Sequence, residues 1–336
     1  MMFGLRESFS YVECSACSSL SLVDVPDDLS RFYPPGYYSF AAPVPPPPSG
    51  IDGAARRVRS ELMLRAAPWL AERVFRAGRC PKFLWWLSGL GLSTRSRVLD
   101  LGSGRGTLLG QMRAEGFTDL TGADPYLDAD ASLANGVQLK RCGIEEVRGQ
   151  FDLVMMNHSF EHVPDAVNAL RQARRLLDPG GTVLVRVPVA DSYAFDVYGP
   201  EWVQLDAPRH ILVPTSSGMA EVAARADMDI VRSFRDSSAF QFWGSEQYRR
   251  DLPLRDPASY AEDPSVLSPE LLRDWKAQAA LLNRRGRGDS AGFVLRPRPT
   301  PEAPGAPTPP RNAHVSNPVL PLVSAPGRPG RRASSA

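Results

Sequence analysis

Two groups of residues in this chain have the types and spacing that could do chemistry. The first is the stretch RVLDLGSGRG, in which Asp100 is followed by Gly102, Gly104 and Gly106 at alternate positions. Glycine has no Cβ, so such a corner lets a ligand approach the backbone closely. A carboxylate just before the corner would repel a phosphate, so Asp100 favours a ligand with a positively charged end.

S-adenosylmethionine fits these residues, because it carries an ammonium and a sulfonium and no phosphate. A second acid, Asp124 in LTGADPY, follows the next apolar run and could accept hydrogen bonds from both ribose hydroxyls. Thr107 stands where a dinucleotide-binding G-x-G-x-x-G would have its third glycine, and no Gly-Lys-Ser/Thr of a P-loop follows. We therefore predict S-adenosylmethionine as the cofactor, with an NAD-dependent oxidoreductase as the alternative.

The second group lies in NHSFEHV and in the later insert YGPEWVQLDAPRHILVPT. The first segment supplies Asn157, His158, Glu161 and His162, and the second supplies Trp202, Asp206, Arg209 and His210. We predict that His162 or His210 takes a proton from the acceptor, with His158 and Glu161 nearby. Alternatively, Glu161 and His162 cap the following helix, and Arg209 and His210 tie the insert to the domain.

These groups need a sheet to bring them together. From Arg97 onward, apolar runs that predict strands alternate with amphipathic stretches that predict helices. The predicted strands are 97–101, 119–124, 137–142, 151–157, 182–189, 228–234 and 291–296, and the predicted helices are 107–116, 165–177 and 216–226. This order is typical of a doubly wound α/β domain with helices on both faces, whose ligands bind beyond the carboxyl ends of the strands.

Four segments, VLDLGSGRG, the acid of GAD, FDLVMMNHSFEHV and LLDPGGTVLV, resemble motifs of the class I S-adenosylmethionine-dependent methyltransferases in order and spacing. The resemblance covers residues 95–236 and reaches 296 with a last strand. It implies a seven-stranded Rossmann-like sheet in which strand 7 is antiparallel and lies beside strand 6. The cofactor-binding residues it implies are Asp100, Gly102, Gly104, Gly106, Asp124, Ile144, Glu145 and Asn157.

In this resemblance Asp100, Gly102 and Gly104 line the methionine end, Asp124 holds the ribose, and Ile144 and Glu145 flank the adenine. Gly106 could instead serve helix packing alone, and Glu145 could be a solvated acid at a helix start. The pair Glu161–His162 is similar to one that implies a divalent cation in some quinone-biosynthesis O-methyltransferases. We expect no metal here.

A cysteine pair precedes this domain. Cys14 and Cys17 in YVECSAC resemble half of the zinc ribbon found ahead of some of these methyltransferases. A closed zinc site needs four ligands, and no second pair stands near, so we expect free cysteines. Cys80 and Cys142 are expected to be structural thiols.

We divide the chain into a small module at 1–40, a Pro-rich linker at 41–53, the methyltransferase domain at 54–296 and a disordered Pro/Arg-rich tail at 297–336. Helices are predicted over 54–77 and 81–90. We expect these helices and the N-terminal module to pack over the catalytic domain and to help close the acceptor pocket. Within the first range, apolar residues recur at roughly helical spacing: Val58, Leu62, Leu64, Trp69, Leu70 and Val74.

Composition excludes several classes of partner. The formal net charge is +2, which gives no sign of a nucleic-acid partner. The longest apolar stretch, FLWWLSGLGL, is well short of the ~20 residues of a membrane span. We therefore expect a cytoplasmic enzyme that methylates a small molecule or a sugar, with a non-catalytic partner protein of the same fold as a further alternative. The sequence leaves the oligomeric state open.

Overall fold

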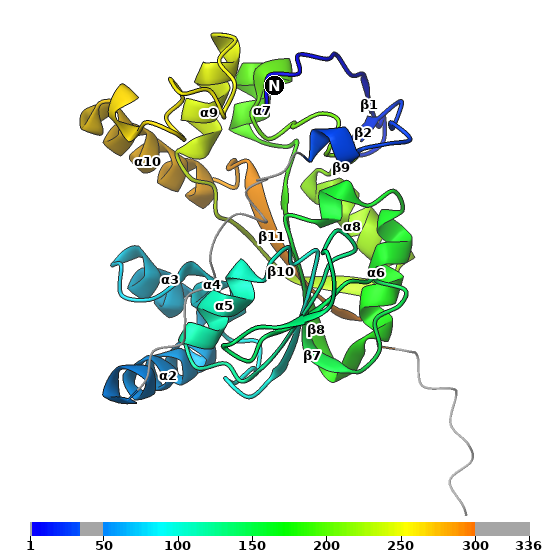
Figure 1. The fold of residues 1–336 in the computed structure, drawn as a ribbon, viewed down its shortest axis with the longest axis vertical. Helices are drawn as coiled ribbons and strands as arrows, with labels where there is room; N and C mark the ends of the chain where they lie inside the picture. The colour runs from blue at the N-terminus through cyan, green and yellow to red at the C-terminus, as the bar shows by residue number, and fades with distance from the viewer. Residues whose placement is uncertain (1, 34–49, 300–336) are drawn as a thin grey trace, which may run out of the picture. The chain divides into compact units, whose positions relative to one another are not determined.

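A large, mostly parallel sheet forms the centre of the molecule (Figure 1). The structure is a computed structural model that describes residues 2–33 and 50–299. The sheet has eight strands in the order β10-β11-β8-β7-β3-β4-β6-β5. The strands are β3 (Arg97–Leu101), β4 (Asp119–Ala123), β5 (Ala131–Ser132), β6 (Gln138–Lys140), β7 (Phe151–Asn157), β8 (Leu177–Pro188), β10 (Met228–Arg235) and β11 (Ser290–Pro297).

The predicted doubly wound sheet is confirmed. Strand β11, the last in sequence, lies between β8 and β10 and is antiparallel to both, as the resemblance implies for strand 7. The two-residue strand β5 pairs antiparallel with β6 and adds an eighth strand at the edge. The carboxyl ends of the parallel strands β3, β4 and β7 therefore meet at one edge of the sheet, where a ligand is expected.

Side chains alternate between two apolar clusters, one on each face of the sheet. Leu99 and Val154 join the cluster that α6 and α8 cover, whereas Val98 and Leu153 join the cluster that α2, α4 and α5 cover. The helices are α2 (Gly50–Arg65), α3 (Pro68–Arg76), α4 (Lys82–Leu87), α5 (Thr107–Ala114), α6 (Ala166–Arg175), α7 (Tyr193–Tyr198), α8 (Ser216–Arg225), α9 (Phe240–Arg249) and α10 (Pro269–Arg284).

The N-terminal module pairs with the insert that follows β8. Strands β1 (Tyr11–Glu13), β2 (Leu20–Leu22) and β9 (Leu212–Val213) form a three-stranded antiparallel sheet. Ser19 extends this contact, because its hydroxyl accepts the backbone N–H of Thr215 at 3.1 Å. The module is thus fixed next to the segment that carries His210.

The helix predicted over 54–77 is two helices, α2 and α3. They are separated just before Pro68, because Ala67 adopts an extended conformation (ψ 141°) there. Of the apolar positions in that pattern, Leu64 is fully buried, whereas Val58, Leu62 and Trp69 are exposed. Helix α2 also places polar side chains on its inward side.

Polar contacts hold the inward side of α2 to the domain. Arg59 pairs with the buried Glu115, and the Ser60 hydroxyl donates to the same carboxylate at 3.2 Å. The Thr94 hydroxyl donates to Glu61 at 2.6 Å. A side chain that satisfies a buried carboxylate can outweigh the apolar pattern of an exposed helix.

Other boundaries also differ from those predicted. Helix α2 begins at Gly50, so the linker ends before residue 54, and β8 begins at Leu177 because the DPGG turn lies within it as an irregularity of pairing. Helices α9 and α10 were not predicted. The remaining linker residues and the tail from 300 lie outside the described residues. No described helix is long and apolar enough to cross a membrane.

Candidate active site

The glycine corner joins β3 to α5 and also contacts the end of β7. Gly102 has φ +73°, and its N–H donates to the carbonyl of Ala123 at 2.8 Å. A Cβ on Gly102 would lie 2.4 Å from the Cβ of Ser159. The Ser159 hydroxyl in turn donates to the carbonyl of Leu101 at 2.6 Å. Glycine at 102 therefore lets the corner lie directly against the segment that carries the histidines.

Asp100 and Asp124 are two buried carboxylates at this corner. Asp124 follows β4 and accepts the backbone N–H groups of Gly104 and Tyr126, each at 2.9 Å. Asp100 is 3% exposed, and its Oδ1 has no hydrogen-bond partner among the described residues. Burial, and then the charge of Asp124, raise the pKa of Asp100 to about 8. An unpaired buried carboxylate at this place fits the ammonium group of the expected cofactor.

The remaining predicted cofactor residues differ in their surroundings. A Cβ on Gly106, which has φ +76°, would lie 3.0 Å from a methyl group of Leu139, so packing alone accounts for this glycine. Ile144 packs against the core, and Glu145 is exposed. The Oδ1 of Asn157 accepts a hydrogen bond from Arg186. Contact of these residues with the cofactor stays a prediction.

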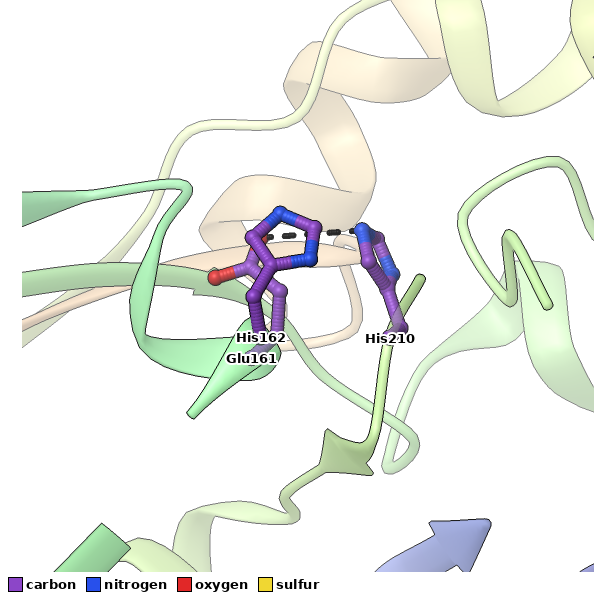
Figure 2. A group of neighbouring side chains, drawn as sticks. All are labelled: Glu161, His162 and His210. Atoms are coloured by element: carbon purple, nitrogen blue, oxygen red, sulfur yellow. Dashed lines mark ion pairs between the residues drawn. The ribbon is translucent and has the colours of Figure 1, made fainter. Parts of the chain in front are cut away.

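The predicted catalytic residues Glu161, His162 and His210 form one cluster (Figure 2). Glu161 and His162 belong to the 3₁₀ helix Phe160–His162, just after β7, whereas His210 comes from the insert. One ligand atom from each of the three residues lies within 4.8 Å of the others. The backbone N–H of Ile211 donates to the carbonyl of Glu161 at 2.8 Å and holds the two segments together.

The atoms that meet in this cluster are hydrogen-bond acceptors. Nδ1 of His162 lies 2.8 Å from the carbonyl of Arg209, and Nδ1 of His210 lies 2.8 Å from that of Gln204. Because a carbonyl only accepts, each Nδ1 must carry the proton, which leaves Nε2 of a neutral ring as an acceptor. Glu161 is fully buried, and neither carboxylate oxygen has a hydrogen-bond partner among the described residues.

The pKa shifts of Glu161 and His210 agree with a cluster of hydrogen-bond acceptors. Burial alone would raise the pKa of Glu161, but His158, His162 and His210 together lower it to about 2. Burial lowers the pKa of His210 to about 4, against the opposing charges of Asp206 and Glu161. At pH 7 Glu161 is thus ionised and His210 neutral. The nearest ring nitrogens of His158 and His210 lie 3.5 and 3.8 Å from this buried carboxylate. A buried negative charge with such distant partners favours a bound cation or a proton-donating ligand.

The metal-free site expected from the sequence stays a prediction, and the cluster also has the atoms that a cation would need. A carboxylate and two imidazole nitrogens are a donor set that suits several divalent cations. The orphaned oxygens of Glu161 show that these residues fit one. By contrast, Cys14 and Cys17 belong to no group of three or more possible metal ligands among the described residues.

His158 stands at the end of β7 in a left-handed conformation, with φ +53°. Its N–H donates to the carbonyl of Arg186 at 2.8 Å, and its Nδ1 lies 3.5 Å from Glu161. A non-glycine residue in this conformation costs free energy, and such residues gather at functional sites. This conformation places the imidazole beside Glu161 and at the wall of the neighbouring cavity.

The sequence also allowed structural roles, in which Glu161 and His162 cap the next helix and Arg209 and His210 tie the insert to the domain. Asp165 caps α6 through the backbone N–H of Asn168, so Glu161 and His162 are not its cap. Arg209 does tie the insert down, because it pairs with Asp206 and donates to the carbonyl of Phe32 at 2.8 Å.

A cavity of about 520 Å³ opens beside the cluster, and we call it the acceptor cavity. Polar walls come from the cluster, from Asp206 and from the pair Arg186–Asp236, and apolar walls come from Phe240, Trp243 and Leu254. Met2 of the N-terminal module also lines it. This supports the prediction that the module helps to close the acceptor pocket.

Several site residues were not predicted. Tyr33 stacks on Tyr126, with ring centroids 5.7 Å apart, and its hydroxyl lies 3.4 Å from Nδ1 of His162. Tyr33 therefore connects Tyr126, which lies two residues after Asp124, to His162 of the cluster. Nothing in its sequence context marks this role. Arg186 does have a signal, because it is a lone charge within the apolar run TVLVRVPV.

Comparison with known proteins shows the family to which the chain belongs. A family model described as a methyltransferase domain matches residues 65–233. The ubiquinone biosynthesis O-methyltransferase of Pseudomonas aeruginosa is 36% identical over 128 residues, which are 34% of this chain and 54% of that protein. The protein of the same name from Paracidovorax citrulli is 30% identical over 202 residues, 54% of this chain and 84% of that protein. The chain thus spans about half the length of the first relative.

Among solved structures, the mycolic acid cyclopropane synthase CmaA1, complexed with S-adenosylhomocysteine, is similar with a TM-score of 0.44. It is 16% identical, and the similarity covers 73% of this chain and 96% of that chain.

Proposed function

Because the chain belongs to the class I S-adenosylmethionine-dependent methyltransferases, we propose that it moves a methyl group from this cofactor to a hydroxyl group of a small-molecule acceptor. One observation carries the choice of a hydroxyl. Glu161, His162 and His210 offer only acceptor atoms to the acceptor cavity. A ligand that binds there must donate, and a hydroxyl group can donate a proton and then act as the nucleophile.

In the proposed reaction the cofactor lies over the glycine corner, with its ammonium at Asp100 and its ribose at Asp124. The acceptor hydroxyl gives its proton to Nε2 of His162 as its oxygen attacks the methyl carbon. The O–CH₃ bond forms and the S–CH₃ bond breaks, and the sulfonium keeps that electron pair as a thioether. Alignment of the two reactants supplies much of the rate.

His162 is the better base of the two clustered histidines. The pKa of His210 is lowered to about 4 by burial, which makes it a weak base near neutral pH. His162 is less buried, and the carbonyl of Arg209 holds its Nδ1, which leaves its Nε2 free to accept a proton. Glu161 lies beside it and stabilises the imidazolium that forms.

A second role for the cluster is supported by the orphaned oxygens of Glu161. Glu161, His162 and His210 would together hold a divalent cation. Such a cation would lower the pKa of an acceptor hydroxyl and so favour its ionised form. Both roles use the same residues toward the same group of the acceptor.

The relatives support an oxygen acceptor, since both are named O-methyltransferases of ubiquinone biosynthesis. Catechols and sugars both offer hydroxyl groups to a cavity of about 520 Å³. An acceptor screen with isotopically labelled S-adenosylmethionine tests the proposal. We expect label in the methyl ether of a catechol or a sugar, and less of it with Glu161→Gln.

Label in amine or carbon acceptors alone would contradict the choice of a hydroxyl. A protein that binds S-adenosylhomocysteine tightly, yet labels no acceptor of any class, would instead be a non-catalytic partner protein. Binding of NAD in place of S-adenosylhomocysteine would restore the oxidoreductase alternative.

A further inference from the structure

A second cavity, of about 350 Å³, lies next to the acceptor cavity, and we call it the side chamber. We propose that the natural acceptor is an elongated molecule. Its hydroxylated end lies in the acceptor cavity, and an aromatic group with an acidic substituent lies in the side chamber. This inference rests on the proposed function, because it assumes that the acceptor cavity holds the methyl acceptor.

The two cavities share one wall, so a single ligand can reach both. Six residues line both of them: Lys82, Asp236, Ser237, Ser238, Phe240 and Trp243. The shared wall comes from the start of α4, the segment after β10 and the start of α9. The side chamber extends away from the histidine cluster, toward α3 and α10.

Aromatic rings line the side chamber on more than one side. Phe75 and Trp85 stack on each other, with centroids 5.8 Å apart and planes 6° apart. Trp243 contacts Tyr260 edge-on, with centroids 5.1 Å apart. All four rings line the chamber. Such walls favour a planar aromatic guest, because rings stack face to face or edge to face.

Charges in the side chamber are mostly positive. Arg76, Lys82 and Lys276 line it, and Asp236 is its one acidic lining residue among the described residues, although Arg76 pairs with Glu72 outside the lining. Lys276, on α10, has no ion pair with any described residue. A free ammonium beside aromatic walls favours an aromatic ligand with a negative group.

Asp236 does not offset these cations, because it is already bound. Its carboxylate lies 2.6 Å from Nη2 of Arg186 and 3.0 Å from Nζ of Lys82, and it accepts the hydroxyl of Ser290 at 2.9 Å. Two cations thus share one carboxylate at the wall between the cavities. Their excess positive charge adds to that of Lys276.

Two fluorescent probes that differ by one group test this assignment. 8-Anilinonaphthalene-1-sulfonate is an aromatic anion, and N-phenyl-1-naphthylamine has the same rings without the sulfonate. Energy transfer from tryptophan to each probe reports binding near Trp85 and Trp243 and needs no methyl transfer. Lys276→Glu reverses the free charge, Lys276→Arg is its matched control, and Ala280→Trp fills the chamber from α10.

For the sulfonate probe, we expect Lys276→Glu to raise Kd about fivefold, as for loss of an exposed ionic contact. Lys276→Arg should leave it within about twofold, and the neutral probe should be affected by neither change. Ala280→Trp should weaken both probes. Saturating catechol should not displace the sulfonate probe, because the two occupy different cavities.

Sulfonate binding that survives both Lys276→Glu and Ala280→Trp would overturn the assignment. Equal weakening of both probes by Lys276→Glu would also contradict it, since the charge would then not be what is recognised. Titration with S-adenosylhomocysteine is measured alongside. Loss of that binding with the probe pattern intact would count against the proposed function and not against the side chamber.

Discussion

Nε2 of His210 lies 3.8 Å from Oε1 of Glu161, which joins a histidine of the insert to an acid at the end of β7 (Figure 2). That distance is too long for a hydrogen bond, and Glu161 is fully buried. The protein therefore keeps an ionised carboxylate and a neutral imidazole face to face. Such a pair is costly without a ligand, so we regard it as built for one.

Glu161→Gln tests the role of this charge. We expect turnover to fall by about 10²-fold or more, as for loss of a proton-transfer or charge-stabilising group. Affinity for S-adenosylhomocysteine should stay unchanged, because Glu161 is not among the residues of the glycine corner. Calorimetry and a labelled-methyl assay measure the two effects. Glu221→Gln, at an exposed position on α8, is the control, and equal turnover in both variants would make Glu161 structural.

His162→Gln and His210→Gln test which of the two histidines removes the proton. We expect His162→Gln to lower kcat by about 10²- to 10⁴-fold with cofactor binding intact. His210→Gln should lower it less, because burial already lowers the pKa of His210 to about 4 and makes it a weak base. The reverse order in kcat would move the base to His210. Full activity in both variants would limit these residues to structural roles.

Addition of divalent cations tests which of its two proposed roles the cluster has, proton removal by His162 or binding of a cation. Because the carboxylate oxygens of the buried Glu161 have no hydrogen-bond partner among the described residues, we expect Mg²⁺, Mn²⁺ or Zn²⁺ to raise the Tm of the wild-type protein after dialysis against EDTA. The Glu161→Gln variant should show no such rise. Loss of activity on dialysis, with recovery on cation addition, would assign proton removal to the bound ion. An unchanged Tm with every ion would leave His162 as base in a metal-free site.

Much of this arrangement follows from the sequence. Near-continuous apolar runs predicted strands such as β3 and β7, because a parallel sheet buries both faces of its strands. The glycines and Asp100 lie at one corner because they span the short turn between the end of β3 and the start of α5. Contacts between distant segments, such as that of Tyr33 with Tyr126, could not be predicted, because no local pattern encodes them.

Helix α2 shows a second limit of sequence patterns. Its apolar residues recur at helical spacing, but Leu64 is buried whereas Val58 and Leu62 are exposed. Ser60 and Arg59 instead contact the domain through a buried carboxylate. The deciding partner is the carboxylate of Glu115, which lies on the next βα unit and is buried. A tertiary hydrogen bond of this kind outweighs an amphipathic pattern, and only the fold reveals it.

Tyr33 offers a test of closure by the N-terminal module. Tyr33→Ala removes the stack on Tyr126, so we expect S-adenosylhomocysteine to dissociate about 2- to 10-fold faster, in line with the free energy of an aromatic pair. Tyr33→Phe keeps the ring and should dissociate as the wild type does. Stopped-flow displacement measures both rates. Equal rates in all three proteins would show that the module does not cover the cofactor.

The raised pKa of Asp100 predicts how cofactor binding depends on pH. Burial and Asp124 raise the pKa of its carboxyl to about 8, so at pH 7 it is mostly protonated in the free protein. The ammonium of the bound cofactor favours the carboxylate, so binding releases a proton. Affinity for S-adenosylhomocysteine should therefore rise from pH 6 to 8, by up to about tenfold per unit, and then level off.

Calorimetry in two buffers of different ionisation enthalpy measures that proton. Asp100→Asn cannot ionise, so its affinity should be lower and independent of pH over the same range. A flat profile in the wild-type protein would place the ammonium away from Asp100.

The most direct test of the account is calorimetric titration of the purified protein with S-adenosylhomocysteine and with NAD, alongside the Asp124→Asn variant. We predict micromolar binding of S-adenosylhomocysteine and none of NAD. The variant should bind S-adenosylhomocysteine more weakly by about 1–3 kcal/mol, because its ribose hydroxyls lose a charged acceptor. Binding of NAD instead, or equal affinity in the variant, would contradict the placement of the cofactor on which the proposed reaction depends.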